Sequence, residues 1–138
     1  MASVVVDASI VLAGIMPDED SAPARAALDC VGEAGAVAPV IWRLEVANAL
    51  LAAERRKRID PPRRKQALAL IAALPIEADL EIWDRAWDAI LPLAQRFGLT
   101  AYDAAYLELA HRTGLPLATL DDDLRAAAMK LGVALAAE

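Results

Sequence analysis

Residues Val4–Ser9 read VVVDAS, and this short stretch decides the fold class of the chain. Three β-branched valines in a row form the kind of apolar run that fills a strand buried on both faces of a sheet. Asp7 ends the run, and the mostly apolar residues 8–13 after it predict one or two helical turns. A buried strand that passes directly into a helix is typical of a parallel sheet with helical connections.

The same alternation continues along the chain. Further short apolar strands are predicted at 37–38, 76, 117–120 and 133–135. The intervening helices are predicted from Ser21 to about Glu33, through Glu45 to about Arg58, from Asp60 to Leu74, from Asp79 to Phe97 with a kink at Pro92, from Thr100 to near Gly114, and from Asp121 to Leu131. We therefore expect an α/β fold, a three-layer sandwich whose short parallel β-sheet of about 4–5 strands is flanked by helices. Residues 1–138 are expected to form one domain.

Composition narrows the class of protein. A hydrophobic content of 58% predicts a folded core, and a formal net charge of −6 argues against a protein that coats nucleic acid. A nuclease is not excluded, because a metal-binding group of acids itself lowers the pI. The single cysteine, Cys30, is expected to be a small buried residue in a reducing compartment. No apolar run has transmembrane length, so we predict a cytoplasmic protein without a membrane partner.

The cations are unevenly distributed. Seven of the fourteen Lys and Arg residues lie in the runs 55–58 and 63–65. One interpretation is a solvated helix end, where cations complement the helix dipole. The other is contact with a phosphate backbone. Both interpretations stay open from the sequence, with the solvated helix end slightly favoured because basic runs are common on surfaces.

Four acids occupy positions where a carboxylate is costly. Glu45 and Asp103 are predicted to lie on the apolar faces of two helices, with no Lys or Arg nearby on the same face. Asp7 and Asp121 each follow a predicted strand, and ligands in open α/β sheets bind beyond the carboxyl ends of strands. Hard divalent cations take oxygen ligands, so the joint pattern points to a divalent metal site suited to phosphodiester hydrolysis.

Each acid also has a local explanation. Asp7 and Asp121 are suited to N-cap the helices that follow them. Glu45 in a first helical turn complements the helix dipole. Asp103 follows Thr100 by three residues, as in a capping box. No single acid therefore identifies a site, and only the four together favour a metal centre.

Four stretches of the chain resemble the motifs of PIN-domain ribonucleases, in the same order and at similar spacing. The likeness extends over nearly the whole chain and is most specific in the third stretch; the stretches are Val4–Ser9, Trp42–Leu50, Leu99–Leu107 and Leu117–Asp121. Among these enzymes the chain is most similar to the single-domain VapC-type toxins of toxin–antitoxin pairs.

The resemblance implies an endoribonuclease that depends on Mg²⁺ or Mn²⁺. The family's catalytic and metal-binding acids match Asp7, Glu45, Asp103 and Asp121. Its supporting polar positions match Ser9, Asn48 and Thr119. An additional acid at Asp122 or Asp123 is implied as well, with Asp123 preferred and a solvated helix N-terminus as the alternative for both.

The resemblance also implies partners. An RNA substrate, a cognate VapB-type antitoxin that blocks the acidic pocket, and homodimerisation through helices are typical of such toxins. The apolar residues 67–74 are one candidate dimer face, although ordinary core packing explains them equally well.

Acids at strand ends are also compatible with other functions. The alternatives are a Mg²⁺-binding receiver-like signalling module, a phosphatase of the haloacid-dehalogenase type, which would want an acid where Ser9 stands, and a catalytically silent PIN fold that only binds a partner. His111 lies toward a helix end, where it complements the dipole. Tryptophans 42, 83 and 87 are expected in the core or an interface rather than stacked on bases.

Overall fold

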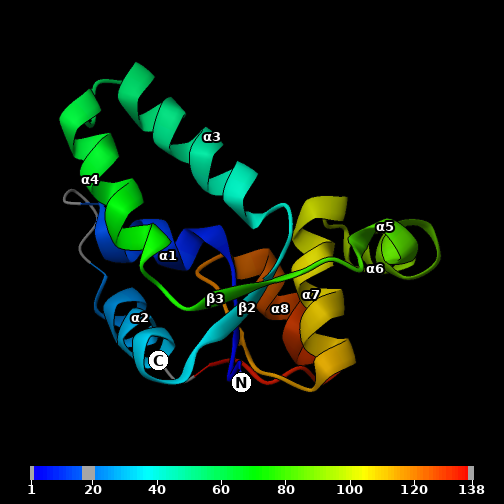
Figure 1. Cartoon of the computed structure of the whole chain (residues 1–138). Helices are drawn as coiled ribbons and strands as arrows, with labels where there is room; N and C mark the ends of the chain where they lie inside the picture. The colour runs from blue at the N-terminus through cyan, green and yellow to red at the C-terminus, as the bar shows by residue number, and fades with distance from the viewer. Residues whose placement is uncertain (1, 17–20, 137–138) are drawn as a thin grey trace.

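A four-stranded parallel sheet lies between two groups of helices (Figure 1). The computed structural model describes residues 2–16 and 21–136. The strands are ordered β3-β2-β1-β4 across the sheet, with bounds β1 Val5–Val6, β2 Ala36–Pro39, β3 Ile76–Asp79 and β4 Leu117–Ala118. The predicted α/β class, the parallel sheet and its size are confirmed.

The helices connect consecutive strands and cover both sides of the sheet. Their bounds are α1 Ala8–Ile15, α2 Ala22–Ala34, α3 Trp42–Arg55, α4 Pro61–Ala72, α5 Ile82–Arg85, a π-helix η1 at Ala86–Ile90, α6 Leu91–Phe97, α7 Ala101–Thr113 and α8 Asp122–Leu131. Short polar side chains begin several of them, since Ser21, Asp60 and Thr100 each accept a hydrogen bond from an amide in the first turn.

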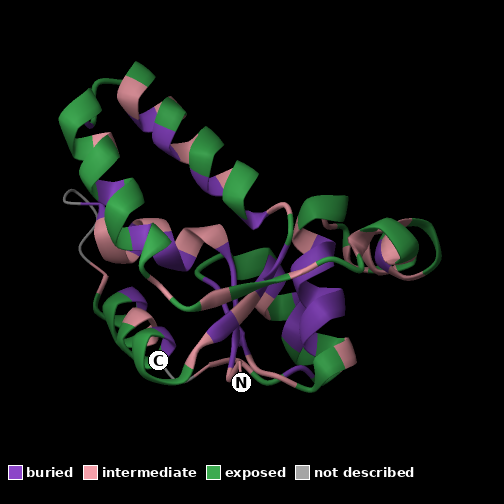
Figure 2. Cartoon of the chain, in the orientation of Figure 1, coloured by how far each residue is buried: buried purple, intermediate pink, exposed green. Residues whose placement is uncertain are grey.

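The core holds the strand ends in place. Val5 and Val6 are fully buried, and Tyr106 and Leu107 of α7 belong to the same apolar core. Figure 2 shows that much of α7 is buried. Burial of such apolar surface stabilises the fold by about 25 cal/mol per Å². The backbone amide of Asp7 donates to the carbonyl of Ala118 at 3.2 Å. The carboxyl ends of β1 and β4 are therefore fixed beside each other at one edge of the sheet.

Two predicted elements differ from the structure. The strand expected at 133–135 is a single parallel bridge between Leu135 and Leu117, because β4 offers only two residues for pairing. The long helix expected over 79–97 begins at Ile82 and is divided into α5, η1 and α6. Pro92 explains the division, since it lacks the amide hydrogen that an unbroken helix needs, and the wider π turn lies directly before it.

One prediction about a single residue is wrong, because Cys30 is exposed rather than buried. Of the three tryptophans, Trp42 lies in the core, whereas Trp83 is 88% exposed and Trp87 is 84% exposed, so for these two only the predicted interface position remains. No helix among residues 2–16 and 21–136 has both the length and the apolarity that crossing a bilayer requires.

Candidate active site

Asp7 lies at the carboxyl end of β1, and its carboxylate accepts several hydrogen bonds. The Ser9 hydroxyl donates to Oδ1 at 2.6 Å, and the Thr119 hydroxyl donates to Oδ2. The Ile10 amide also donates to Oδ1 at 3.3 Å, so Asp7 N-caps α1 as well. Asp7 is only 7% exposed. Burial raises the pKa of Asp7 above its ordinary value, and the two hydroxyl bonds act in the opposite direction.

Glu45 is half-buried in the first turn of α3, where Tyr106 of α7 reaches it. The phenol of Tyr106 donates a short hydrogen bond to Oε1 of Glu45. Burial raises the pKa of Glu45, while this hydrogen bond lowers it. The pKa of Tyr106 is raised by its own burial and then by the bond to Glu45, so the phenol keeps its proton and remains the donor. The bond therefore fixes the direction in which the Glu45 carboxylate points.

Asp103, in the first turn of α7, links the other acids electrostatically. After burial, its charge helps to raise the pKa of both Asp7 and Glu45. The pKa of Asp103 is itself raised by burial, then by the charge of Asp121, with a smaller contribution from Asp123. Four acids from distant parts of the sequence are thus close enough to repel one another; Asp7, Glu45, Asp103 and Asp121 are called the acid cluster.

Asp121 joins the cluster through backbone and hydroxyl contacts. Its carboxylate N-caps α8 by accepting from the Leu124 amide at 2.9 Å. Its own amide donates to the Thr119 hydroxyl at 3.0 Å, and the Leu120 amide donates to the Ser9 hydroxyl at 3.1 Å. The two hydroxyls therefore tie the Asp7 carboxylate to the turn that carries Asp121.

In the part of the chain that the structure describes, no cation compensates the central acids. Asp7, Glu45 and Asp103 form no ion pair with any residue that the structure describes. Within the same described ranges, no three His, Cys, Asp or Glu side chains already stand in an arrangement that could hold a metal ion. The donor set nevertheless fits a hard divalent cation, because it consists of carboxylate oxygens whose mutual repulsion a positive charge would relieve.

Some predicted site residues stand apart from the cluster. Asn48 is exposed one turn after Glu45, and its side chain forms no hydrogen bond with the described part of the chain. Of the two additional acids, Asp123 acts on the pKa of Asp103, and no such effect accompanies Asp122. Asp123 therefore faces the cluster more directly.

The sequence pattern places Tyr106 on the same helix face as Asp103 but does not indicate that Tyr106 is a site residue. Its contact with Glu45 spans 61 residues, so spacing within one helix could not reveal it. One signal was available: Tyr106 follows Asp103 by three residues, which places a buried hydroxyl on the face that carries the acid.

A second group of charged residues lies at the far end of α7 and includes arginines as well as acids. Arg112 donates to Glu108 at 2.9 Å, to Asp79 at 2.9 Å and to Glu81 at 2.6 Å. Arg85 donates to Glu81 at 3.2 Å and lies 3.9 Å from Glu108. We call these five residues the arginine network. It joins the end of β3 and the start of α5 to α7 by charge-assisted hydrogen bonds.

Comparisons with known proteins identify a protein family and several similar solved structures. A family model described as "PIN domain" matches residues 4–130. The structure reported as PAE2754 from Pyrobaculum aerophilum superposes with a TM-score of 0.64 and 26% sequence identity, over 91% of this chain and 79% of that one. A comparison with curated proteins gives no match.

Proposed function

This chain belongs to the PIN-domain family, whose members are generally nucleases, and we propose that it is an endoribonuclease dependent on Mg²⁺ or Mn²⁺. More narrowly, we propose a VapC-type toxin in which residues 1–138 form a single PIN-like domain. The family match does not favour a receiver-like signalling module.

The convergence of the acid cluster carries the proposal. Its members come from β1, α3, α7 and the turn before α8, yet Asp103 raises the pKa of two of them and is itself affected by the fourth. Uncompensated carboxylates destabilise a folded protein. Such a group is therefore a candidate for a functional site, where a ligand supplies the missing positive charge. A divalent cation together with a phosphodiester is a ligand of that kind.

The side chains divide the work. Asp7, Glu45, Asp103 and Asp121 would hold the cation, which, when bound, supplies Lewis acidity at the phosphate. Ser9 and Thr119 orient the Asp7 carboxylate by donating to both of its oxygens. Tyr106 orients Glu45 in the same way. Asp123 adds negative charge at the rim, and Asn48 offers an amide to the substrate near Glu45.

The toxin assignment also names partners. We propose a cytoplasmic protein that is neutralised by a cognate VapB-type antitoxin and forms a homodimer through its helices. Exposed apolar side chains on α4 and on the α5–η1 segment are surfaces that such partners would cover; they include Leu68, Leu70, Trp83 and Trp87. Light scattering of the pure chain, alone and with a co-expressed antitoxin, tests both partners.

The decisive experiment is incubation of the pure protein with structured RNAs in Mg²⁺, in Mn²⁺ or in EDTA. Asp7→Asn is the matched control, because it removes one charge and keeps the shape of the side chain. We expect cleavage that requires metal and disappears in Asp7→Asn. Equal cleavage by the variant would reject the site, and metal binding without cleavage of any RNA would favour a silent PIN fold.

A further inference from the structure

The α3–α4 hairpin ends in a strongly basic segment that the proposed chemistry does not use. Residues 54–65, the hairpin tip, contain seven Lys and Arg against the acids Glu54 and Asp60, a formal charge of +5. The whole chain has a net charge of −6, which leaves −11 for the remainder. Figure 1 shows the tip as the part of the hairpin furthest from the sheet. The tip is therefore a basic segment on an otherwise acidic chain.

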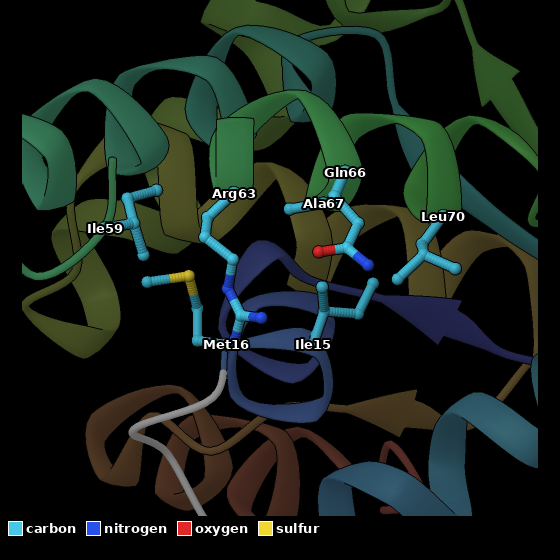
Figure 3. A pocket seen from close by; sticks show the side chains of 7 residues that line it. All are labelled: Ile15, Met16, Ile59, Arg63, Gln66, Ala67 and Leu70. Carbon is cyan, nitrogen blue, oxygen red and sulfur yellow. The ribbon is translucent and has the colours of Figure 1, made fainter. Parts of the chain in front are cut away.

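Two of these cations, Arg64 and Arg58, have partners within the protein. Arg64 donates to Glu54 at 2.6 Å. Arg63 extends from α4 toward Met16 and Ile15, across a cavity of about 150 Å³ between α4 and α1 (Figure 3). Its side chain covers this cavity without forming an ion pair with the described residues.

The cations at the end of α3 are not engaged in this way. Arg55, Arg56 and Lys57 are exposed, and their side chains form no ion pair or hydrogen bond with the described residues. Lys57 also lines a hollow of about 450 Å³ together with Arg58 and Pro61. Three adjacent free cations beside a hollow form a site that an anionic ligand can enter.

Lys57 adopts a backbone conformation that lysine rarely takes. Its φ is 59°, and it is the one non-glycine residue with positive φ in the described part of the chain. The Arg58 amide donates to the Ala53 carbonyl and the Lys57 amide to the Glu54 carbonyl, which is the hydrogen-bond pattern of a Schellman motif. Glycine normally occupies this position, so the lysine is held at a cost to stability, as functional residues often are.

The tip and the acid cluster share α3. Ten residues separate Glu45 from Arg55, which is about 15 Å along the helix axis. One folded RNA can therefore touch both ends of the helix. The tip also lacks the aromatic side chains that anchor protein interfaces, and its apolar residue Ile59 is buried.

We propose that Arg55, Arg56 and Lys57 form an anchor that binds the phosphate backbone of structured RNA and holds it across the acid cluster. Phosphate contacts position a nucleic acid without selecting its sequence. Exposed Lys and Arg side chains without partners are suited to such contacts. The inference deepens the proposed function and rests on it for RNA as the ligand.

The test measures binding of a labelled RNA hairpin in EDTA, where cleavage is absent, over a range of salt concentrations. We compare Lys57→Gly and the pair Arg55→Gln/Arg56→Gln with a control pair, Arg96→Gln/Lys130→Gln, which removes two exposed charges elsewhere. Each lost phosphate contact should lower the salt slope by about one, and the tip pair should bind on the order of tenfold more weakly at low salt. The control pair should bind like the natural chain.

Lys57→Gly separates anchoring from folding. Glycine accepts positive φ without strain, so this variant should melt at a higher temperature while it binds RNA more weakly. Unchanged affinity in the tip variants, or an equal loss in the control pair, would overturn the anchor. Tip-dependent binding with no metal-dependent cleavage would retain the anchor and reject the nuclease. Metal-dependent cleavage with tip-independent binding would support the nuclease and reject the anchor.

Discussion

Helix α7 contributes one carboxylate to each of two groups of acids, and only one of these groups also contains cations. Asp103 at its start belongs to the acid cluster, whereas Glu108 further along belongs to the arginine network. Glu108 is more deeply buried than Asp103, yet Arg112 and Arg85 compensate it. Nothing equivalent compensates Asp103 within the described residues. The difference shows that this fold pairs a buried acid when the acid serves structure, and leaves acids unpaired where a ligand is to supply the charge.

The largest expected effect comes from removing the charge of Asp103. Asp103→Asn should reduce RNA cleavage by at least about 10²-fold, because Asp103 is the acid that faces all the others. The same change should leave the metal-free melting temperature unchanged or higher, since it removes repulsion from the cluster. Cleavage kinetics and calorimetry on one preparation measure both. A variant that loses activity only because it melts earlier would contradict the comparison.

Removing a cation from the arginine network should lower stability and leave the acid cluster's function nearly unchanged. Arg112→Met leaves Glu108, Asp79 and Glu81 without their shared partner and should destabilise the fold by about 3 kcal/mol. Urea denaturation measures this change, with the exposed Arg96→Met as control. Metal binding at a temperature where the variant remains folded should be nearly unchanged. If Arg112→Met weakened metal binding as much as Asp103→Asn, the two groups would not be independent.

Tyr106→Phe tests how the uncompensated group is oriented. The variant keeps the ring in the core and removes only the donor to Glu45. Loss of an orienting contact of this kind typically weakens metal affinity about 10-fold or more, while stability should change by only about 1 kcal/mol. Mn²⁺ titration by calorimetry is the measurement. Unaltered Mn²⁺ affinity would assign Tyr106 to packing alone.

The smallest expected effect is a dependence of stability on pH. Burial raises the folded-state pKa values of Asp7, Glu45 and Asp103, so the folded protein binds more protons than the unfolded chain. Stability of the metal-free protein should therefore rise modestly as pH falls from about 8 to about 5, and the gain is fully present only below the unfolded values near 4. Melting curves should show a weaker rise for Asp103→Asn. Identical slopes for both proteins would contradict the raised pKa values.

The sequence predicted the parts of the molecule that depend on local order. The valine run at residues 4–6 predicted strand β1 and the parallel class of the sheet. Parallel topology then predicted that Asp7 and Asp121 lie at the same edge of the sheet. The apolar faces around Glu45 and Asp103 predicted that these acids turn inward. The capping roles of Asp7, Asp103 and Asp121 are compatible with the acid cluster. Each residue takes part in a helix cap through its side chain or its backbone amide, and its carboxylate still lies near the other acids.

What the sequence could not predict depends on partners far apart in the chain. The bond from Tyr106 to Glu45 and that from Arg112 to Asp79 join segments 61 and 33 residues apart, and no periodicity connects them. Helical spacing placed Trp83 in the core or an interface, and it could not decide between the two; the side chain is 88% exposed in the single chain. The predicted strand at 133–135 is only a single bridge, because the neighbouring strand β4 has only two residues.

Because Asp7 is both the N-cap of α1 and a member of the acid cluster, an inactive form of this protein should lose the charge of Asp7 but keep the cap. Asparagine begins helices as well as aspartate does, so Asp7→Asn silences the site and leaves the start of α1 supported. Asp7→Ala would remove the cap together with the charge and cost about 1 kcal/mol in addition. A cell producing the asparagine form should accumulate intact folded protein, whereas the alanine form is open to degradation. A loss of activity in cells therefore reports on the site only after correction for the amount of folded protein.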